Sequence, residues 1–173
     1  MAWNTLADSR LARLTALDIL AQTYTTMSQV DLDLAGNLFA ALYDNTVTPD
    51  VDAATTLATY SGASSTWSAT GGATGTPQVY QAGQWAQGGI VVPSTALSVV
   101  AGGIVKFTSG ALVSGSTATM SAIRGMMLYF TNATGGGQTK PVLGYWYFGA
   151  DYAVTSGTLT ITPNASGLFR LTT

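Results

Sequence analysis

The aspartates are the groups in this sequence with the clearest capacity for chemistry. All eight acidic residues are aspartates, and the 173-residue chain has no histidine or cysteine. Asp31 and Asp33 lie two residues apart, as do Asp50 and Asp52, so each pair would share one face of an extended strand. A carboxylate pair is what a glycoside hydrolase needs, and Asp44, Asp50 and Asp52 would suit calcium if their turn folds back. In the simpler interpretation, all of these are turn and surface acids.

Most other catalytic classes lack their essential residues. Without histidine or cysteine there is no Ser-His-Asp or Cys-His arrangement and little chance of a zinc site. The run GGGQTK at residues 135–140 has the wrong spacing for a phosphate loop, and we interpret it as a hairpin loop. A Ser–Lys dyad using Lys106 or Lys140 stays formally open, although no serine is singled out. We therefore predict a protein that is not an enzyme and has no cofactor or metal site.

The composition favours assembly with other proteins. The chain is 47% hydrophobic but only 8% charged, with a net charge of −2, far below the usual charged share of about a quarter. A surface so poor in charge suits a protein packed against other copies or other proteins, and a secreted β domain with a neutral surface is the alternative. The sequence has no basic cluster, so a nucleic-acid partner is not expected. No apolar run is long enough to span a membrane, and no signal peptide is evident.

Short apolar segments separated by turn residues predict β-strands along most of the chain. Leu38–Tyr43 is the first strong core strand, and Ala96–Val100 with Ile104–Thr108 form an expected hairpin. The C-terminal run contains three more predicted strands. In residues 141–148, odd- and even-numbered positions are both apolar, as in a strand with both faces covered. In residues 154–162, apolar and polar residues alternate. Residues 168–172 form the last predicted strand. Because short turns join them, with a break at residues 149–151, we expect antiparallel neighbours in one core sheet.

Roughly eight or more such strands predict an all-β fold, an antiparallel β-sandwich or a jelly-roll-like barrel, with an N-terminal α-helix. The helix is predicted over residues 9–22, where leucines recur every three residues after the potential caps Asp8 and Ser9. We divide the chain into an N-terminal helical arm, residues 1–29, and a β-sandwich domain, residues 30–173. The helix would pack on its own sheet or dock on a neighbouring subunit.

A long excursion at residues 52–83, rich in Ala, Thr, Ser and Gly, interrupts the strand pattern. A loop of this length in a compact domain is usually functional or docked on a partner. From the predicted arm, this excursion and the segment after it, the candidate partner-contact residues are Leu11, Leu14, Leu17, Tyr60, Trp67, Tyr80 and Trp85.

A series of short motifs follows a fixed order along the chain: VDLDL (30–34), LFAALY (38–43), TPD (48–50), WAQGGI (85–90), IRGMMLY (123–129), GYWYFGAD (144–151), GTLTI (157–161) and GLFRL (167–171). Taken in this order, the motifs resemble a family of small tailed-bacteriophage virion proteins. Residues 52–83 and Pro93 depart from the pattern. The resemblance implies a virion structural protein of the capsid decoration (cement) type.

Such a protein would lie on the outer surface of the capsid as a dimer or trimer and bridge subunits of the major capsid protein. The alternative is a tail-fibre or host-recognition module, in which the excursion, Trp67 and Trp85 would bind cell-surface glycan.

Overall fold

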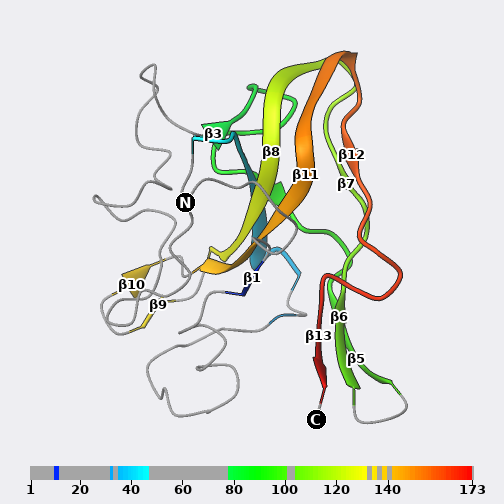
Figure 1. Cartoon of the computed structure of the whole chain (residues 1–173). Helices are drawn as coiled ribbons and strands as arrows, with labels where there is room; N and C mark the ends of the chain where they lie inside the picture. The colour runs from blue at the N-terminus through cyan, green and yellow to red at the C-terminus, as the bar shows by residue number, and fades with distance from the viewer. Residues whose placement is uncertain are drawn as a thin grey trace.

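Every regular element in the part of the chain that the structure describes is a β-strand. The computed structural model describes residues 10–11, 32, 35–46, 78–100, 104–131, 134–135, 138–139 and 142–172. The strands are β1 (Arg10–Leu11), β2 (Leu38–Tyr43), β3 (Gln78–Val79), β4 (Ile90–Val91), β5 (Ala96–Val100), β6 (Ile104–Thr108), β7 (Leu112–Val113), β8 (Ala118–Phe130), β9 (Thr134–Gly135), β10 (Gln138–Thr139), β11 (Val142–Gly157), β12 (Thr160–Ile161) and β13 (Phe169–Thr172). All pairings are antiparallel, and the sheets curl into a half-barrel (Figure 1). The predicted all-β class is therefore confirmed.

The main sheet is built around the long strands β8 and β11, in the order β1-β11-β8-β2-β3, with β4 also paired to β2. β2 has the predicted bounds and pairs with β8 along its whole length, from Leu38 opposite Phe130 to Tyr43 opposite Gly125. A three-stranded sheet, β13-β6-β5, and two-stranded ribbons, β12-β7 and β10-β9, complete the described part. The β9–β10 pair agrees with the hairpin predicted for the glycine-rich run.

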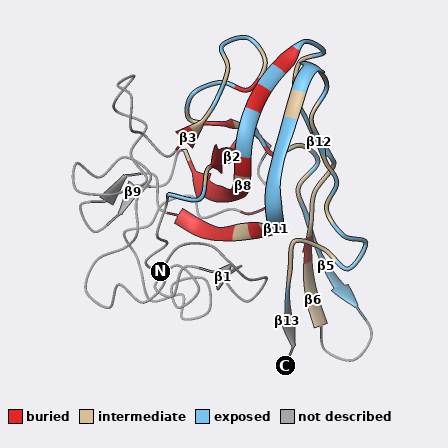
Figure 2. Cartoon of the chain, turned by 45° about the horizontal axis from the view of Figure 1, so that its top comes forward, coloured by how far each residue is buried: buried red, intermediate tan, exposed pale blue. Residues whose placement is uncertain are grey.

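The main sheet has a buried cluster on each face, and Figure 2 shows buried residues along β2, β8 and the first part of β11. On one face, Leu42 and Leu128 join a core that also takes in Phe107 of β6 and Leu112 of β7. On the other face, Tyr43 and Tyr145 belong to a second cluster with Met127. The first half of β11 has four buried residues in a row, from Val142 to Tyr145, which confirms the prediction that both of its faces are covered. Each buried large aliphatic side chain contributes about 1.5–3 kcal/mol through removal of apolar surface from water.

β-Bulges allow β8 and β11 to bend while they stay paired. Tyr147 lies opposite Gly125 but Tyr152 lies opposite Ile123, so β11 carries extra residues there, and Gly149 has a φ of 88°. The next two register shifts contain Ala122 and Ser156, with φ angles of 57° and 48°. A residue with positive φ is typical of the G1 type of bulge, and bulges increase the local twist of the strand. Gly149, predicted to break the strand, is instead a bulge within it.

The C-terminal run does not form one sheet of neighbouring strands, which corrects the prediction. Its first two predicted strands largely merge into the 16-residue strand β11, which pairs with β8 and β1. β12 pairs with β7, and β13 pairs with β6. Short connections favour adjacent pairing, but β12 and β13 find their partners far away in the chain.

The predicted N-terminal helix is not seen in the described residues. Arg10 and Leu11, inside the predicted helix, form β1 and pair with Tyr145 and Gly144. The rest of that helix, and most of the arm at residues 1–29, lie outside the described residues. Pairing with β11 overrides the helical preference of residues 10–11, because it gives hydrogen-bond partners to backbone N–H and C=O groups at that edge of the main sheet.

Candidate protein-interaction surface

Val99 on the strand β5 is the most exposed of the large apolar side chains in the described chain, and two more exposed ones lie on the same strand. All five of its residues, ALSVV, are exposed. Leu97, Val99 and Val100 expose 44%, 81% and 39% of their surface, and for Val99 this is close to the value of an unfolded chain. Contiguous exposed apolar residues on a folded domain usually mark an interaction site.

β5 is also an edge strand. It pairs with β6 over its full length, from Ala96 opposite Thr108 to Val100 opposite Ile104, and among the described strands it has no partner on its other side. In Figures 1 and 2 it borders the small sheet on the outside. In an antiparallel strand every second residue directs its N–H and C=O away from its one neighbour. The edge therefore presents both apolar side chains and backbone hydrogen-bonding groups.

The two faces of the small sheet differ in chemistry. The first face carries Phe107, buried in the core, and Phe169, whose ring centroid lies 5.1 Å from that of Phe107. Leu97 lies opposite Phe107 and Val99 opposite Val105 on this same face, so the core face of the sheet continues as an uncovered apolar surface on β5. The other face carries Lys106 opposite Arg170, and Lys106 Nζ donates to the carbonyl oxygen of Ala165 at 3.3 Å.

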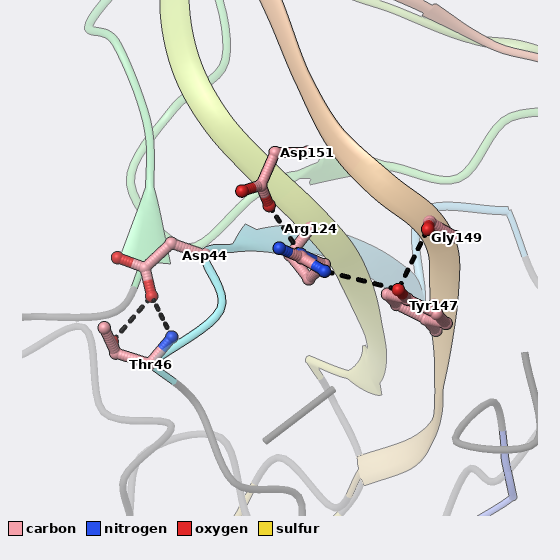
Figure 3. Close-up of polar contacts among 6 residues, drawn as sticks. All are labelled: Asp44, Thr46, Arg124, Tyr147, Gly149 and Asp151. Atoms are coloured by element: carbon pink, nitrogen blue, oxygen red, sulfur yellow. Dashed lines mark hydrogen bonds and ion pairs between the residues drawn. The ribbon is translucent and has the colours of Figure 1, made fainter. Parts of the chain in front are cut away.

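A polar cluster lies at the bulge of β11 that contains Gly149 (Figure 3). Arg124 donates from Nε to Asp151 and from Nη1 to the hydroxyl of Tyr147 at 3.3 Å, and Tyr147 donates to the carbonyl oxygen of Gly149 at 2.9 Å. The guanidinium also lies 5.8 Å from the centre of the Tyr147 ring. These contacts tie the extra residues of the bulge to β8.

The electrostatics of this cluster fit a structural role. The hydrogen bond to Asp151, and secondarily that to Tyr147, raises the pKa of Arg124 above its ordinary value. An arginine with a raised pKa keeps its proton at every pH a cell reaches, so it cannot act as a general acid or base. The cluster therefore holds the bulge of β11 in place.

The carboxylate hypotheses fall largely outside the described residues. Asp44 is described, and its carboxylate accepts hydrogen bonds from the Thr46 backbone N–H at 2.8 Å and the Thr46 hydroxyl at 2.6 Å, as in a capped turn (Figure 3). Asp31, Asp33, Asp50 and Asp52 lie outside. Within the described residues no group of three potential ligands is positioned to hold a metal ion, and no helix could span a membrane.

A shallow apolar pocket of about 210 Å³ lies beside the bulged part of β11. It is lined by Ile123, Phe148, Tyr152, Leu159, Thr160 and Ile161. Phe148 and Tyr152 meet edge to face, with ring centroids 6.3 Å apart. Apart from the hydroxyls of Thr160 and Tyr152, the lining side chains cannot hydrogen-bond, whereas a glycan site needs several polar groups that converge on the sugar. The pocket does not have the chemistry of a sugar site.

Of the candidate contact residues from the sequence, the structure describes Leu11, Tyr80 and Trp85. Trp85 is fully buried, and its indole Nε1 donates to the carbonyl oxygen of Ala40 at 3.2 Å, so its ring is a core residue and is not available to a partner. Tyr80 is at the surface, with 36% of it exposed. Leu11 lies in β1. Leu14, Leu17, Tyr60 and Trp67 lie outside the described residues.

The sequence interpretation located β5 and missed its exposure. The bounds of the β5–β6 hairpin were predicted as observed. An apolar strand without charge normally indicates a buried strand, and only the pairing order shows that this one lies at an edge. The absence of charged residues from β5 was the one feature of its sequence that fits a strand covered by a partner.

Comparisons with known proteins do not assign the chain to a group. The protein-family models, the curated proteins and the solved structures contain no match to it.

Proposed function

We propose that this protein is a non-enzymatic structural component of a bacteriophage virion, a capsid decoration (cement) protein. It would bind the outer surface of the capsid and stabilise the head by bridging subunits of the major capsid protein. The observation that carries the proposal is the uncharged, uncovered strand β5. An apolar strand this exposed lowers the solubility of an isolated protein and is expected only where a partner covers it.

Composition and resemblance support the same proposal. Only 8% of the residues are charged, and the polar contacts around Arg124 and Asp44 hold local structure. The sequence motifs between residues 30 and 171, taken in their order along the chain, resemble those of virion proteins of tailed phages. A chain whose surface is apolar and weakly charged gains free energy mainly by burying surface against other proteins.

The finer fold assignment belongs to this proposal. We infer that the main sheet and the smaller sheets are the two layers of a β-sandwich or of a jelly-roll-like barrel. The support is the shared core, in which Phe107 and Leu112 of the smaller sheets join the residues of β2, β8 and β11. This architecture would place the edge of β5 at the rim, where a neighbour can reach it.

The test is binding of the purified protein to expanded heads of its own phage, assembled without it. We expect saturable co-sedimentation with the heads and a higher temperature of head disruption once the sites are filled. Native heads that already carry the protein are the matched control and should bind none. If the heads without it also bind none, the cement function is rejected.

A further inference from the structure

The edge of β5 lacks the protection that monomeric β-proteins give to their edges. Edge strands are usually guarded by a charged side chain, a proline or a bulge that stops another chain from pairing. β5 has the sequence ALSVV, and its register with β6 is regular over all five residues. Nothing in the strand itself therefore prevents another strand from adding to it.

We propose that β5 pairs, antiparallel and across a twofold axis, with β5 of a second copy of this chain. Centred on Ser98, this register puts Ser98 opposite Ser98 of the second copy, Leu97 opposite Val99, and Ala96 opposite Val100. The proposal deepens the assembly function above and rests on it, because it names the partner of the exposed strand.

The register satisfies the geometry of both the backbone and the side chains. Residues that face each other across the axis have the same parity, so the residues whose N–H and C=O point outward meet residues of the same kind. Leu97 and Val99 lie on the core face of the small sheet, and across the axis each meets the other on that same face. The pairing thus joins two three-stranded sheets into one of six strands with a continuous apolar face.

The charges next to β5 favour pairing at the edge over stacking of faces. Lys106 lies one strand inside β5, opposite Ser98, and Arg170 lies one strand further. Across the axis the two copies of Lys106 would be three strand spacings apart, about 14 Å, which is beyond the screening length of about 8 Å at physiological salt. Stacking the outer faces of two sheets would instead bring these cations together.

The size of the contact predicts weak pairing in free solution. A stable interface buries about 800 Å² on each partner, and a five-residue strand about 17 Å long covers less than half of that by itself. Copies held side by side on a capsid have a high effective concentration, so the same contact would be filled there. We therefore expect a monomer–dimer equilibrium that is visible only in concentrated samples.

Sedimentation equilibrium of the full-length protein, from about 5 µM to about 1 mM, tests the pairing. We expect reversible dimerisation, and at least a tenfold weaker association for Val99→Lys, because a desolvated lysine would lie opposite an apolar side chain. Val113→Lys is the matched control: Val113 is 50% exposed on β7 and should leave dimerisation unchanged. A strictly monomeric protein, or equal effects of the two variants, overturns the proposal.

Two further variants test the register. The double variant Leu97→Asp with Val99→Lys places opposite charges across the axis twice and should regain most of the association that Val99→Lys loses. Ser98→Cys introduces the only cysteine of the chain, at the position that meets its own copy, about 5 Å away between Cβ atoms. Mild oxidation or a short bismaleimide should link it into a covalent dimer, whereas Ser116→Cys, at an exposed turn, should stay monomeric.

The outcomes separate this inference from the cement function. In one outcome, Val99→Lys abolishes head binding and the unmodified protein forms no dimer at any concentration. A strand of the capsid protein would then occupy β5, and only the assignment of the partner as a second copy would be overturned. A dimer that links through Ser98→Cys but does not bind heads would leave the inference standing and reject the cement function.

Discussion

At the residue scale, Trp85 shows how a local turn decides between core and surface. The backbone N–H of Trp85 donates to Gln81 at 2.9 Å, and that of Gln81 donates back to Trp85, also at 2.9 Å. This closed turn directs the indole beneath β2, where its N–H finds the carbonyl oxygen of Ala40. A single aromatic residue in a polar segment carries no periodicity, so the sequence could not show on which side of the turn the ring would lie.

Gly89 is the residue whose replacement we expect to be most damaging in this region. It has a φ of +94°, and a Cβ there would lie 2.0 Å from the carbonyl oxygen of Ala40. Gly89→Ala should therefore lower the free energy of unfolding by about 3 kcal/mol or more, through backbone strain and a clash with β2. Urea unfolding followed by tryptophan fluorescence measures the change.

Gly83→Ala is the matched control for this prediction. Gly83 also has a positive φ, +76°, but no atom lies within 4 Å of the place of its Cβ. Only the conformational cost of about 1–2 kcal/mol should remain. If both variants lose the same stability, the close approach of Gly89 to β2 does not contribute.

At the element scale, β8 and β11 are long because bulges absorb their mismatches. β8 has 13 residues and β11 has 16, well above the usual strand length of about 5–6. From the sequence, the region of β11 was divided into shorter strands because residues 149–151 were predicted to be a break. The positive φ angles of Gly149 and Ala122, both at register shifts, show that the strands insert extra residues and continue their pairing.

The bulge at Ala122 predicts an unusual stabilisation by glycine. Ala122 has a φ of 57°, where an alanine costs about 1–2 kcal/mol relative to glycine. After the entropy that glycine adds to the unfolded chain, Ala122→Gly should still raise the free energy of unfolding by about 0.5–1 kcal/mol. Ala153→Gly, at another exposed position on β11 and outside the positive-φ set, should instead lower it by about the same amount. Equal losses from both substitutions would argue against strain at the bulge.

At the scale of the whole molecule, low charge sets how copies interact. With eight acidic and six basic residues in 173, long-range repulsion between copies is small and apolar contacts dominate association. Arg124 and Asp151 pair with each other, and Lys106 and Arg170 lie one and two strands inside β5. Assembly through β5 is therefore expected to depend on apolar burial and strand pairing.

This balance predicts that dimerisation is nearly independent of salt. Between about 50 mM and about 500 mM sodium chloride the dissociation constant should change less than threefold, because screening acts on charges that the contact does not use. Sedimentation equilibrium in the two buffers measures this. A loss of affinity greater than tenfold at high salt would show that ion pairs hold the dimer.

The sequence by itself determined the strand class of the chain and the bounds of several strands. Hydrophobic patterning is local, so Leu38–Tyr43 and the hairpin Ala96–Val100 with Ile104–Thr108 could be read directly, as could the two covered faces of early β11. Only the tertiary structure decided which strands are neighbours, that residues 10–11 pair as a strand, and that Trp85 is buried. It also decided that β5 is an edge. Strand pairing depends on partners distant in the chain, and the exposure of an apolar strand depends on what the rest of the fold leaves uncovered.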